Sequence, residues 1–195
     1  RKNRVAVVLK GPRGCGKGTF ANDLMGRIFG RGVHFAHVSD AADITGDFNA
    51  LLATAVFIVL DEAVWAGDHK GRNVMKSLLG DAVKTRKQKF KDNINVQSFD
   101  HFVINSNNSF AAPLDKDDRS YAVFTVSNTH HGDHAYWAAV HQEMGGGGRE
   151  AFLHHLLLER DVSGFVPDRI PACMDAARWG VKQHSLGVVD TWVLR

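Results

Sequence analysis

The nine-residue segment Gly11–Thr19 constrains the possible folds of this chain more than any other part of its sequence. It reads GPRGCGKGT, follows the apolar run Val5–Leu9 and precedes apolar residues at helical spacing over Thr19–Phe29. A strand, a glycine-rich loop and a helix in this order are the context in which the GxxxxGK pattern binds phosphate. The glycines let backbone N–H groups converge on phosphate oxygens, and the helix start adds positive potential. We therefore predict a nucleotide-binding loop made of Gly11, Pro12, Arg13, Gly14, Cys15, Gly16, Lys17, Gly18 and Thr19.

Two side chains of this loop have defined expected roles. Lys17 is expected to reach the β- and γ-phosphates of ATP. The Ser or Thr that usually holds Mg²⁺ follows the lysine directly, but here Gly18 stands in that place. We therefore assign the Mg²⁺ ligand to Thr19, one residue further on. An ordinary glycine-rich turn is the alternative, and the number of matching features in the right context argues against it.

A second polar pair follows the continuous apolar run Ala55–Leu60. Such a run is typical of a strand buried inside a parallel sheet, and it ends in Asp61 and Glu62. At the carboxyl edge of a parallel sheet, these carboxylates face a bound nucleotide. We expect Asp61 to hold Mg²⁺, mostly through water, and Glu62 to orient or deprotonate the attacking water. Taken alone, a strand that ends in Asp-Glu is as often a solvated turn, but its place after a phosphate-binding loop favours the functional interpretation.

Short apolar strands alternate with helical segments along the first part of the chain, a pattern that indicates an α/β fold. We predict a central, mainly parallel five-stranded sheet flanked by helices in residues 1–128, and a C-terminal helical region in residues 129–195. The expected strands are 5–9, 33–38, 55–60, 102–104 and 121–126, with a hairpin over 83–96. The expected helices are 19–29, 48–52, 74–79, 136–144, 149–159, 173–183 and 186–194.

Composition narrows the class of protein further. A chain of 195 residues, of which 44% are hydrophobic and 23% charged, can bury a core without disulfides or a structural metal. The longest apolar run is far too short to cross a bilayer, so no membrane association is expected. The two cysteines form no disulfide framework, which indicates a reducing compartment. The chain begins without Met and ends abruptly, so we expect it to be a piece of a longer protein.

A third short strand, His101–Ile104, ends in the polar residues Asn105, Ser106 and Asn107. The phosphate loop, the Asp-Glu strand and the Ser-Asn strand occur in an order that resembles the superfamily 3 helicases. These are ring-forming relatives of the AAA+ ATPases found in viral and phage replication proteins. More narrowly, the chain is similar to the helicase part of phage and prophage primase–helicase or primase–polymerase proteins. The segments that carry this similarity are TGDFN (45–49), DEAVWAG (61–67), KSLL (76–79), GF (164–165) and RIP (169–171).

The resemblance implies an AAA+-like P-loop NTPase core that acts as an ATP-dependent DNA helicase or translocase in phage-type replication. Such a motor hydrolyses MgATP at the subunit interfaces of a ring, where Asn107 would sense the γ-phosphate. Arg119 would reach the γ-phosphate held by the neighbouring subunit. Relatives often carry two adjacent arginines at this place, whereas here Ser120 follows Arg119.

The partners that the resemblance implies are single-stranded or forked DNA, further copies of the chain in a hexameric ring, and an upstream primase or polymerase domain. A monomer is the alternative for the isolated piece. If the protein is encoded by a phage or prophage, its expected location is the cytoplasm of the host cell.

The basic segment Lys84–Lys91 carries five positive charges and no acid, and it lies within the expected hairpin. A basic loop with an aromatic residue suits tracking of a nucleic-acid backbone combined with base stacking. In the resembling family, a hairpin between the second and third motifs points into the ring channel and grips single-stranded DNA. We therefore take Lys87, Lys89 and Phe90 as the candidate DNA-binding residues, with a solvated hairpin as the alternative.

Two other functions stay open on the sequence alone. The GPxGxGKGT pattern is also similar to adenylate kinase, so a nucleoside monophosphate kinase is one alternative. That family lacks the Asp-Glu and Ser-Asn strands and has an arginine-rich lid instead. The other alternative is a nucleotide-switched clamp or loader that binds DNA without unwinding it. The joint presence of Lys17, Asp61 and Glu62 argues against a protein that does not hydrolyse nucleotide.

Overall fold

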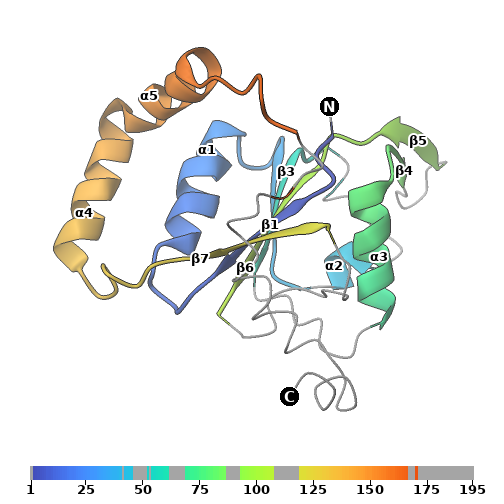
Figure 1. The fold of residues 1–195 in the computed structure, drawn as a ribbon, viewed down its shortest axis with the longest axis horizontal. Coiled ribbons are helices and arrows are strands. Elements are labelled where there is room, and N and C mark those ends of the chain that lie inside the picture. The colour runs from blue at the N-terminus through green and yellow to red at the C-terminus, as the bar shows by residue number, and fades with distance from the viewer. Residues whose placement is uncertain are drawn as a thin grey trace.

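The computed structural model describes residues 2–40, 42–45, 52, 54–61, 69–86, 93–107, 119–166 and 170 (Figure 1). At its centre, five strands form one sheet in the order β2-β3-β6-β1-β7. Every neighbouring pair of these strands is parallel, which confirms the expected mainly parallel five-stranded sheet. The strands are β1 (Ala6–Lys10), β2 (Phe35–Val38), β3 (Phe57–Asp61), β6 (His101–Ser106) and β7 (Tyr121–Thr125).

The register of the sheet brings the carboxyl ends of its strands to one edge. Lys10 at the end of β1 is paired with Ser106 at the end of β6, and Asp61 at the end of β3 is paired with Asn105. Strand β6 lies between β1, which precedes the glycine-rich loop, and β3, which ends in Asp61. The end of β6 is therefore next to both the loop and the carboxylate.

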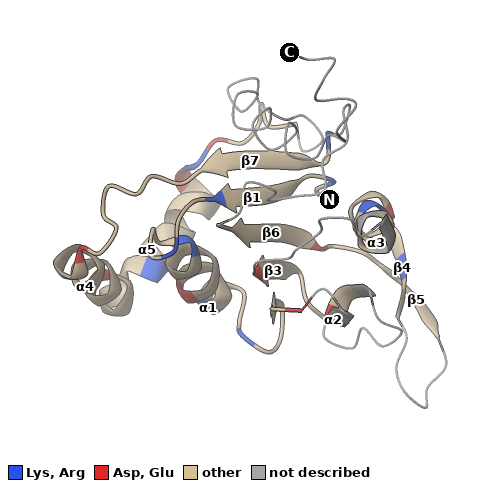
Figure 2. Cartoon of the chain, turned by 90° about the horizontal axis from the view of Figure 1, so that it is seen from below, with Lys and Arg blue, Asp and Glu red and all other residues tan. Residues whose placement is uncertain are grey.

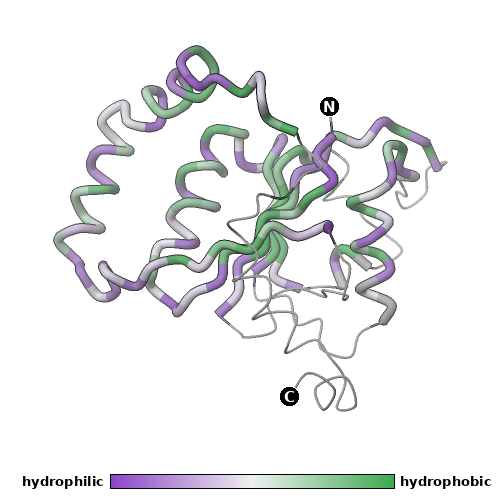
Figure 3. The backbone as a smooth tube through the Cα atoms, viewed as in Figure 1, coloured by the Kyte–Doolittle hydropathy of each residue, from purple (hydrophilic) through white to green (hydrophobic). Residues whose placement is uncertain are grey.

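Alternating side chains of the strands pack into two apolar layers, one on each face of the sheet. One layer contains Ala21, Phe35, Phe57, Val59 and Val103. The other layer is larger and includes Val8, Ile58, Leu60, Phe102, Ile104, Tyr121, Met75 and Leu79. Figure 2 shows helices on both sides of the sheet, with α1 on one side and α3 on the other. The central strands are accordingly among the apolar parts of the chain (Figure 3).

The helices that flank the sheet lie close to where the sequence predicts them. The helix after the glycine-rich loop is η1 (Thr19–Met25), continued by α1 (Gly26–Ile28). On the opposite face, α2 (Ala42–Thr45) precedes α3 (His69–Gly80), which is longer than the expected 74–79. Helix α3 packs on the sheet through Met75 and Leu79, which are four residues apart and therefore share one helix face. Most of the helical turn expected over 48–52 lies outside the described residues.

The expected hairpin is present as a separate antiparallel pair, β4 (Val83–Arg86) and β5 (Ile94–Gln97). An ion pair between the Lys84 ammonium and the Asp100 carboxylate attaches its base to the main sheet. Both side chains are almost completely buried, and the ammonium lies 6.0 Å from the centre of the Phe102 ring. One of the five positive charges of the basic segment is therefore used inside the fold.

The described chain after β7 is helical, as predicted for 136–144 and 149–159. The helices are α4 (His134–Glu143), η3 (Met144–Gly148), α5 (Arg149–His154) and η4 (His155–Glu159). Four consecutive glycines form most of η3, and Gly147 has a φ of 104°, a conformation that glycine adopts without strain. This bend lets α4 run beside α1 while α5 returns to contact α1 (Figure 1).

The helices expected over 173–183 and 186–194 lie outside the described residues. Within the described part of the chain, no helix has the length and apolar character needed to span a membrane.

Candidate functional site

The glycine-rich loop leaves the carboxyl end of β1 and enters η1. The Gly11 N–H donates to the Ser106 carbonyl oxygen across 3.0 Å, which ties the start of the loop to β6. Gly14 and Gly16 have φ values of 76° and 94°, in the left-handed region that favours glycine. A Cβ at Gly16 would in addition lie 2.2 Å from Cη2 of Trp137 on α4. Both the turn of the loop and its contact with α4 therefore require glycine at position 16.

Lys17 lies over the loop with its ammonium group held by uncharged partners. Its Nζ donates to the carbonyl oxygens of Gly11 and Pro12 at 2.7 and 2.8 Å, and it lies 3.7 Å from Cys15 Sγ. Among the described residues, no carboxylate is paired with this ammonium. An anion at the loop would therefore meet an ammonium group that no acid of the described ranges neutralises.

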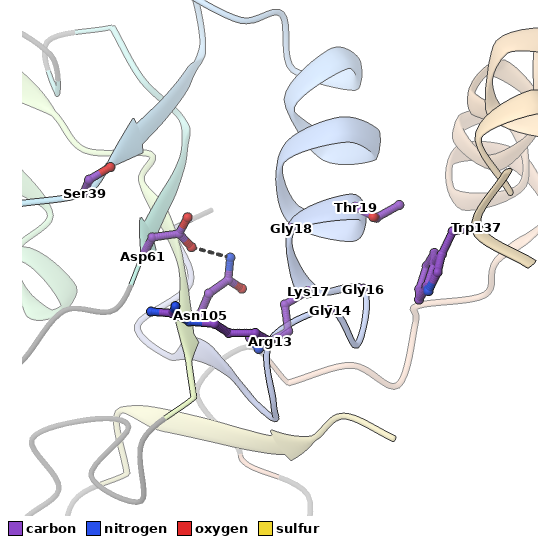
Figure 4. Close-up of a pocket in the computed structure, with 10 residues that line it drawn as sticks. All are labelled: Arg13, Gly14, Gly16, Lys17, Gly18, Thr19, Ser39, Asp61, Asn105 and Trp137. Carbon is purple, nitrogen blue, oxygen red and sulfur yellow. Dashed lines mark hydrogen bonds between the residues drawn. The ribbon is translucent and has the colours of Figure 1, made fainter. Parts of the chain in front are cut away.

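A pocket of about 710 Å³ extends from this loop to the ends of β2, β3 and β6 (Figure 4). This volume lies within the range of about 300–1,000 Å³ that is typical of small-molecule sites. Its lining combines the loop and the start of η1 with polar side chains from the sheet edge and an indole from α4. The lining residues are Arg13, Gly14, Gly16, Lys17, Gly18, Thr19, Ser39, Asp61, Asn105 and Trp137.

The Asp61 carboxylate is held at this pocket by side chains from the two neighbouring strands. Asn105 Nδ2 donates to Asp61 Oδ1 at 2.7 Å, and His37 Nε2 lies 2.7 Å from Asp61 Oδ2. A third of the Asp61 side chain remains exposed, so the carboxylate can still contact a ligand. Three adjacent strands thus contribute one polar side chain each to a row along the carboxyl edge of the sheet.

Asn105 is almost completely buried, with 3% of its surface exposed. Because a carboxylate only accepts hydrogen bonds, the amide nitrogen must face Asp61 and the amide oxygen must face away from it. Within the described part of the chain, that buried oxygen has no hydrogen-bond partner. A buried acceptor without a partner costs about 1–3 kcal/mol. The Asn105 side chain lies between Asp61 and the loop (Figure 4), so its main effect on the pocket is the orientation of the Asp61 carboxylate.

Trp137 is fixed in place at the start of α4. The Asp133 carboxylate caps this helix by accepting from the Tyr136 N–H at 2.9 Å, and this hydrogen bond lowers the pKa of Asp133. Trp137 Nε1 donates to the His130 carbonyl oxygen at 2.8 Å. The Tyr136 and Trp137 rings meet edge to face, with centroids 5.0 Å apart and planes at 81°. These contacts hold the indole as a fixed wall beside Gly16.

The structure brings together most of the residues predicted to bind nucleotide and metal. Those that line the pocket are Arg13, Gly14, Gly16, Lys17, Gly18, Thr19 and Asp61. Gly11 and Pro12 supply the carbonyl oxygens that hold Lys17, while Cys15 is buried at 6% exposure. The other predicted residues Glu62, Lys87, Lys89 and Phe90 lie outside the described part of the chain.

Two predicted residues are described but lie away from the pocket lining. Asn107 is exposed just beyond the end of β6, two residues after Asn105. Arg119 is exposed and precedes Ser120, whose carbonyl oxygen accepts from the Ala6 N–H at 2.8 Å. Arg119 therefore lies at the amino edge of the sheet, a strand length away from the glycine-rich loop of its own chain.

Sequence reasoning missed four residues of the pocket and its support: His37, Ser39, Asn105 and Trp137. Asn105 could have been found from the strand register, because it is the residue paired with Asp61. His37 lies near the end of β2 and Ser39 directly follows that strand, and only the order of the strands puts them at the same pocket as Asp61. Trp137 gave no signal, since its place depends on how α4 folds back over the loop.

Comparison with known proteins relates these residues to a described family. The family described as "Family of unknown function (DUF5906)" matches residues 9–120. The matched range runs from the end of β1 to the residue before β7, so it contains the glycine-rich loop, Asp61 and Asn105.

A relative with an assigned activity is the DNA Primase-polymerase of Nitratiruptor phage NrS-1. The two sequences are 28% identical over 128 residues, which is 64% of this chain. The same stretch is 17% of the phage protein, so this chain corresponds to a small part of that relative.

Solved structures of the NrS-1 C-terminal region share the fold. An apo structure of that region has a TM-score of 0.78 at 20% sequence identity, over 95% of this chain and 44% of that chain. An A-form apo structure gives a TM-score of 0.76 at 22% identity, over 95% of this chain and 43% of that chain. The likeness establishes the fold, and this chain spans less than half the length of those structures.

Proposed function

This chain belongs to the DUF5906 family, and we propose that it is the ATP-driven motor part of a phage-type DNA replication protein. In this proposal it is a P-loop NTPase of the superfamily 3 helicase type, which hydrolyses MgATP at the interfaces of a hexameric ring. The relationship to the DNA Primase-polymerase of phage NrS-1 supports a role in phage DNA replication. An upstream primase or polymerase domain and action in the host cytoplasm belong to the same proposal.

The observation that carries the proposal is the position of Lys17 and Asp61 in one pocket at the carboxyl edge of a parallel sheet. In open α/β sheets, ligands bind outside the carboxyl ends of the strands. The loop N–H groups and the Lys17 ammonium suit the β- and γ-phosphates of a nucleotide. Asp61, on the sheet side of the loop, then marks the end of the pocket where the terminal phosphate lies.

The Asp61 carboxylate at this end of the pocket fits a magnesium ion, because Mg²⁺ prefers oxygen ligands and keeps several waters. Thr19, the other proposed ligand, lines the same pocket, but its side chain lies on the Trp137 side of the helix and does not share this end with Asp61 (Figure 4). When bound, Mg²⁺ neutralises charge on the phosphates. His37 and Asn105 each bond to one oxygen of Asp61, so the orientation of the carboxylate is set before any ligand binds.

Water activation is assigned to Glu62, which directly follows Asp61 in the sequence. Its carboxylate would orient the attacking water at the terminal phosphate. Of the two asparagines near the end of β6, Asn105 is better placed to act beside that phosphate, because it lines the pocket and orients the Asp61 carboxylate. The resemblance favours Asn107 for this role, so Asn107 is the alternative that must be tested beside Asn105.

The position of Arg119 at the amino edge of the sheet supports the ring in this proposal. An arginine there is remote from the pocket of its own chain, so a role at a γ-phosphate requires a neighbouring subunit. Its planar guanidinium suits the charge spread over transferring phosphoryl oxygens. Arg119 would therefore complete the site of the next copy, as the resemblance to ring ATPases implies.

The DNA contact is assigned to the tip of the β4–β5 hairpin. Lys84 is paired with Asp100, so the charges left for DNA are those further along the basic segment. Lys87 and Lys89 would track the phosphate backbone, and Phe90 would stack on a base. We further propose residues 1–128 as the ATPase core and residues 129–195 as an attached helical region.

The test is phosphate release from ATP, measured with and without single-stranded DNA, beside mass photometry of the same sample. The proposal expects hydrolysis that DNA stimulates. Glu62→Gln should bind ATP but turn it over very slowly, because its carboxylate acts on water instead of on the phosphates. The matched control is Lys76→Ala on α3, which lies on the other face of the sheet and should hydrolyse normally.

The same assay separates the alternatives. A nucleoside monophosphate kinase would convert AMP and ATP into ADP without releasing phosphate. A clamp or loader that only switches would bind ATP and DNA without sustained turnover. Either outcome would replace the motor assignment.

A further inference from the structure

A second pocket adjoins the first one on the side of the loop that faces α4. Its volume is about 700 Å³, and it lies between the sheet and the helices η1 and α4. Its walls are mainly apolar side chains, among them Leu9 of β1, Phe124 of β7, Phe20 of η1 and Val140 of α4. A cavity of this kind favours a flat, weakly polar group over a charged one, because its walls offer apolar contact.

The two pockets meet at four residues that line both of them: Gly16, Lys17, Thr19 and Trp137. Asp61 and Asn105 lie on the opposite side of the loop from Trp137 (Figure 4). A triphosphate that lies along the loop with its terminal phosphate at Asp61 therefore has its other end near Trp137. That other end is the nucleoside, and it faces the entrance of the second pocket.

Resting on the proposed function, we infer that this apolar pocket is the base subsite of the nucleotide and accepts the four common bases about equally. The base enters beside the Trp137 indole and is held by stacking and apolar contact. Stacking on an aromatic side chain tolerates every base, because each base has a π face. The substrates are therefore nucleoside triphosphates as a class, with ATP as one member.

Among the described residues that line this pocket, few side chains are polar and most of these are bonded elsewhere, so their side chains offer little that could recognise the edge of a base. Lys17 Nζ donates to two loop carbonyls, and Trp137 Nε1 donates to the His130 carbonyl oxygen. The Thr19 hydroxyl lies where the two pockets meet, and the Cys15 thiol is a weak donor. Sites built to hydrogen-bond a substrate group discriminate by about 10⁴–10⁵, whereas apolar pockets reach only about 10- to 200-fold.

The test compares magnesium ATP with magnesium tripolyphosphate, which carries phosphates but no base, by calorimetry on the full chain. Wild type should bind ATP roughly 5- to 150-fold more tightly than tripolyphosphate, the gain expected from one stacked base. Trp137→Ala should lose this difference while its affinity for tripolyphosphate is unchanged. Trp137→Phe should keep most of the difference, because a phenyl ring still stacks.

The matched control is His141→Ala, which removes an exposed ring-bearing side chain of the same helix. His141 contributes to the lining of neither pocket, so both affinities should stay as in wild type. Unchanged tripolyphosphate binding by Trp137→Ala also shows that the loop is intact, so a loss of ATP selectivity is not a loss of fold. Wild type should bind GTP, CTP and UTP within about tenfold of ATP.

Two results would overturn the base subsite: an ATP advantage that survives Trp137→Ala, or a preference for one base above about 10³. If wild type binds neither ATP nor tripolyphosphate, the proposed nucleotide function and the base subsite both fail. If both ligands bind and Trp137 has no effect, the proposed function stands and only the base subsite fails.

Discussion

Asn105 Nδ2 donates to Asp61 Oδ1 across 2.7 Å and joins the ends of two adjacent parallel strands. The bond turns the amide oxygen of Asn105 away from the carboxylate, where it is buried without a partner among the described residues. Asn105 thus orients the Asp61 carboxylate at the edge of the pocket. This effect depends on the register of β3 and β6, which pairs these two residues.

Asn105→Ala should lower kcat for ATP hydrolysis by about 10²–10³, the usual cost of removing one preorganised polar contact at a reacting group. The Kd for ATP should change much less, because the loop and Lys17 remain. Asn107→Ala is the matched control and should retain near-normal turnover. Phosphate-release rates and ATP affinities of the two variants check this, and a larger loss in Asn107→Ala would assign the phosphate contact to Asn107.

Lys17→Ala should abolish ATP binding or hydrolysis while leaving the fold intact. The reason is the loss of an ammonium group that is held over the loop and paired with no described carboxylate. Lys76→Ala removes a charge of the same kind on α3 and should behave as wild type. Filter binding measures the affinity for ATP, and a circular dichroism spectrum checks that the variant is folded. Hydrolysis at the wild-type rate by a folded Lys17→Ala protein would refute the role assigned to Lys17.

Arg119→Ala should bind ATP nearly normally but hydrolyse it poorly. In well-studied cases, an arginine that acts across an interface raises kcat by about 10³–10⁵. Mixing Arg119→Ala with Lys17→Ala should restore some activity, because one type of interface in the mixed ring joins an intact loop to an intact arginine.

The control for Arg119 is Arg160→Ala, at another exposed arginine of the described chain, which should leave the rate unchanged. All rates are measured where mass photometry detects rings. If Arg119→Ala is fully active under those conditions, Arg119 has a structural role, for example in an ion pair with a neighbouring acid.

Replacing Lys87 and Lys89 with Ala should weaken single-stranded DNA binding for every sequence tested. Each lost phosphate contact should flatten the slope of log affinity against log salt by roughly 0.7. Basal ATP hydrolysis should survive, because the hairpin is separate from the nucleotide pocket. Fluorescence anisotropy over a salt series measures the slope, with Lys76→Ala as the control. An unchanged slope would make the hairpin tip a solvated surface.

Stability should fall as the pH drops below about 6.5, the ordinary pKa of a histidine, in part because of His101. Burial lowers the pKa of His101, and the positive charge of Lys2 adds to the effect. The unfolded chain therefore binds this proton more readily, so the stabilising contribution is complete above the unfolded pKa and is lost at lower pH. His101→Gln should have a smaller drop in urea midpoint between pH 7 and pH 5. If the urea midpoint falls equally in wild type and His101→Gln, His101 does not contribute to the pH dependence of stability.

Local sequence patterns were sufficient for the five strands of the main sheet and for the loop, whereas α2 was not predicted. The continuous apolar run before Asp61 predicted β3, and the spacing of the loop glycines predicted the turn that Gly14 and Gly16 make with positive φ. These features depend on neighbours in the sequence, so the sequence alone contains them.

The residues that sequence reasoning missed depend on long-range packing. Asn105 and Asn107 are both polar residues at a strand end, and only the pairing of β6 with β3 makes Asn105 the one beside Asp61. Trp137 reaches Gly16 because α4 returns over the loop, and nothing near position 137 encodes that approach. The choice between equivalent residues, and any contact made by a distant helix, therefore required the three-dimensional structure.

The buried ion pair of Lys84 with Asp100 joins the hairpin to the start of β6, the strand whose other end reaches the pocket. Asp100 directly precedes β6, a strand of six residues, about 20 Å long, that is hydrogen-bonded on both sides and so resists stretching. Asn105 lies near the far end of that strand. A displacement of the hairpin would therefore act on β6 at the end opposite to the amide that orients Asp61.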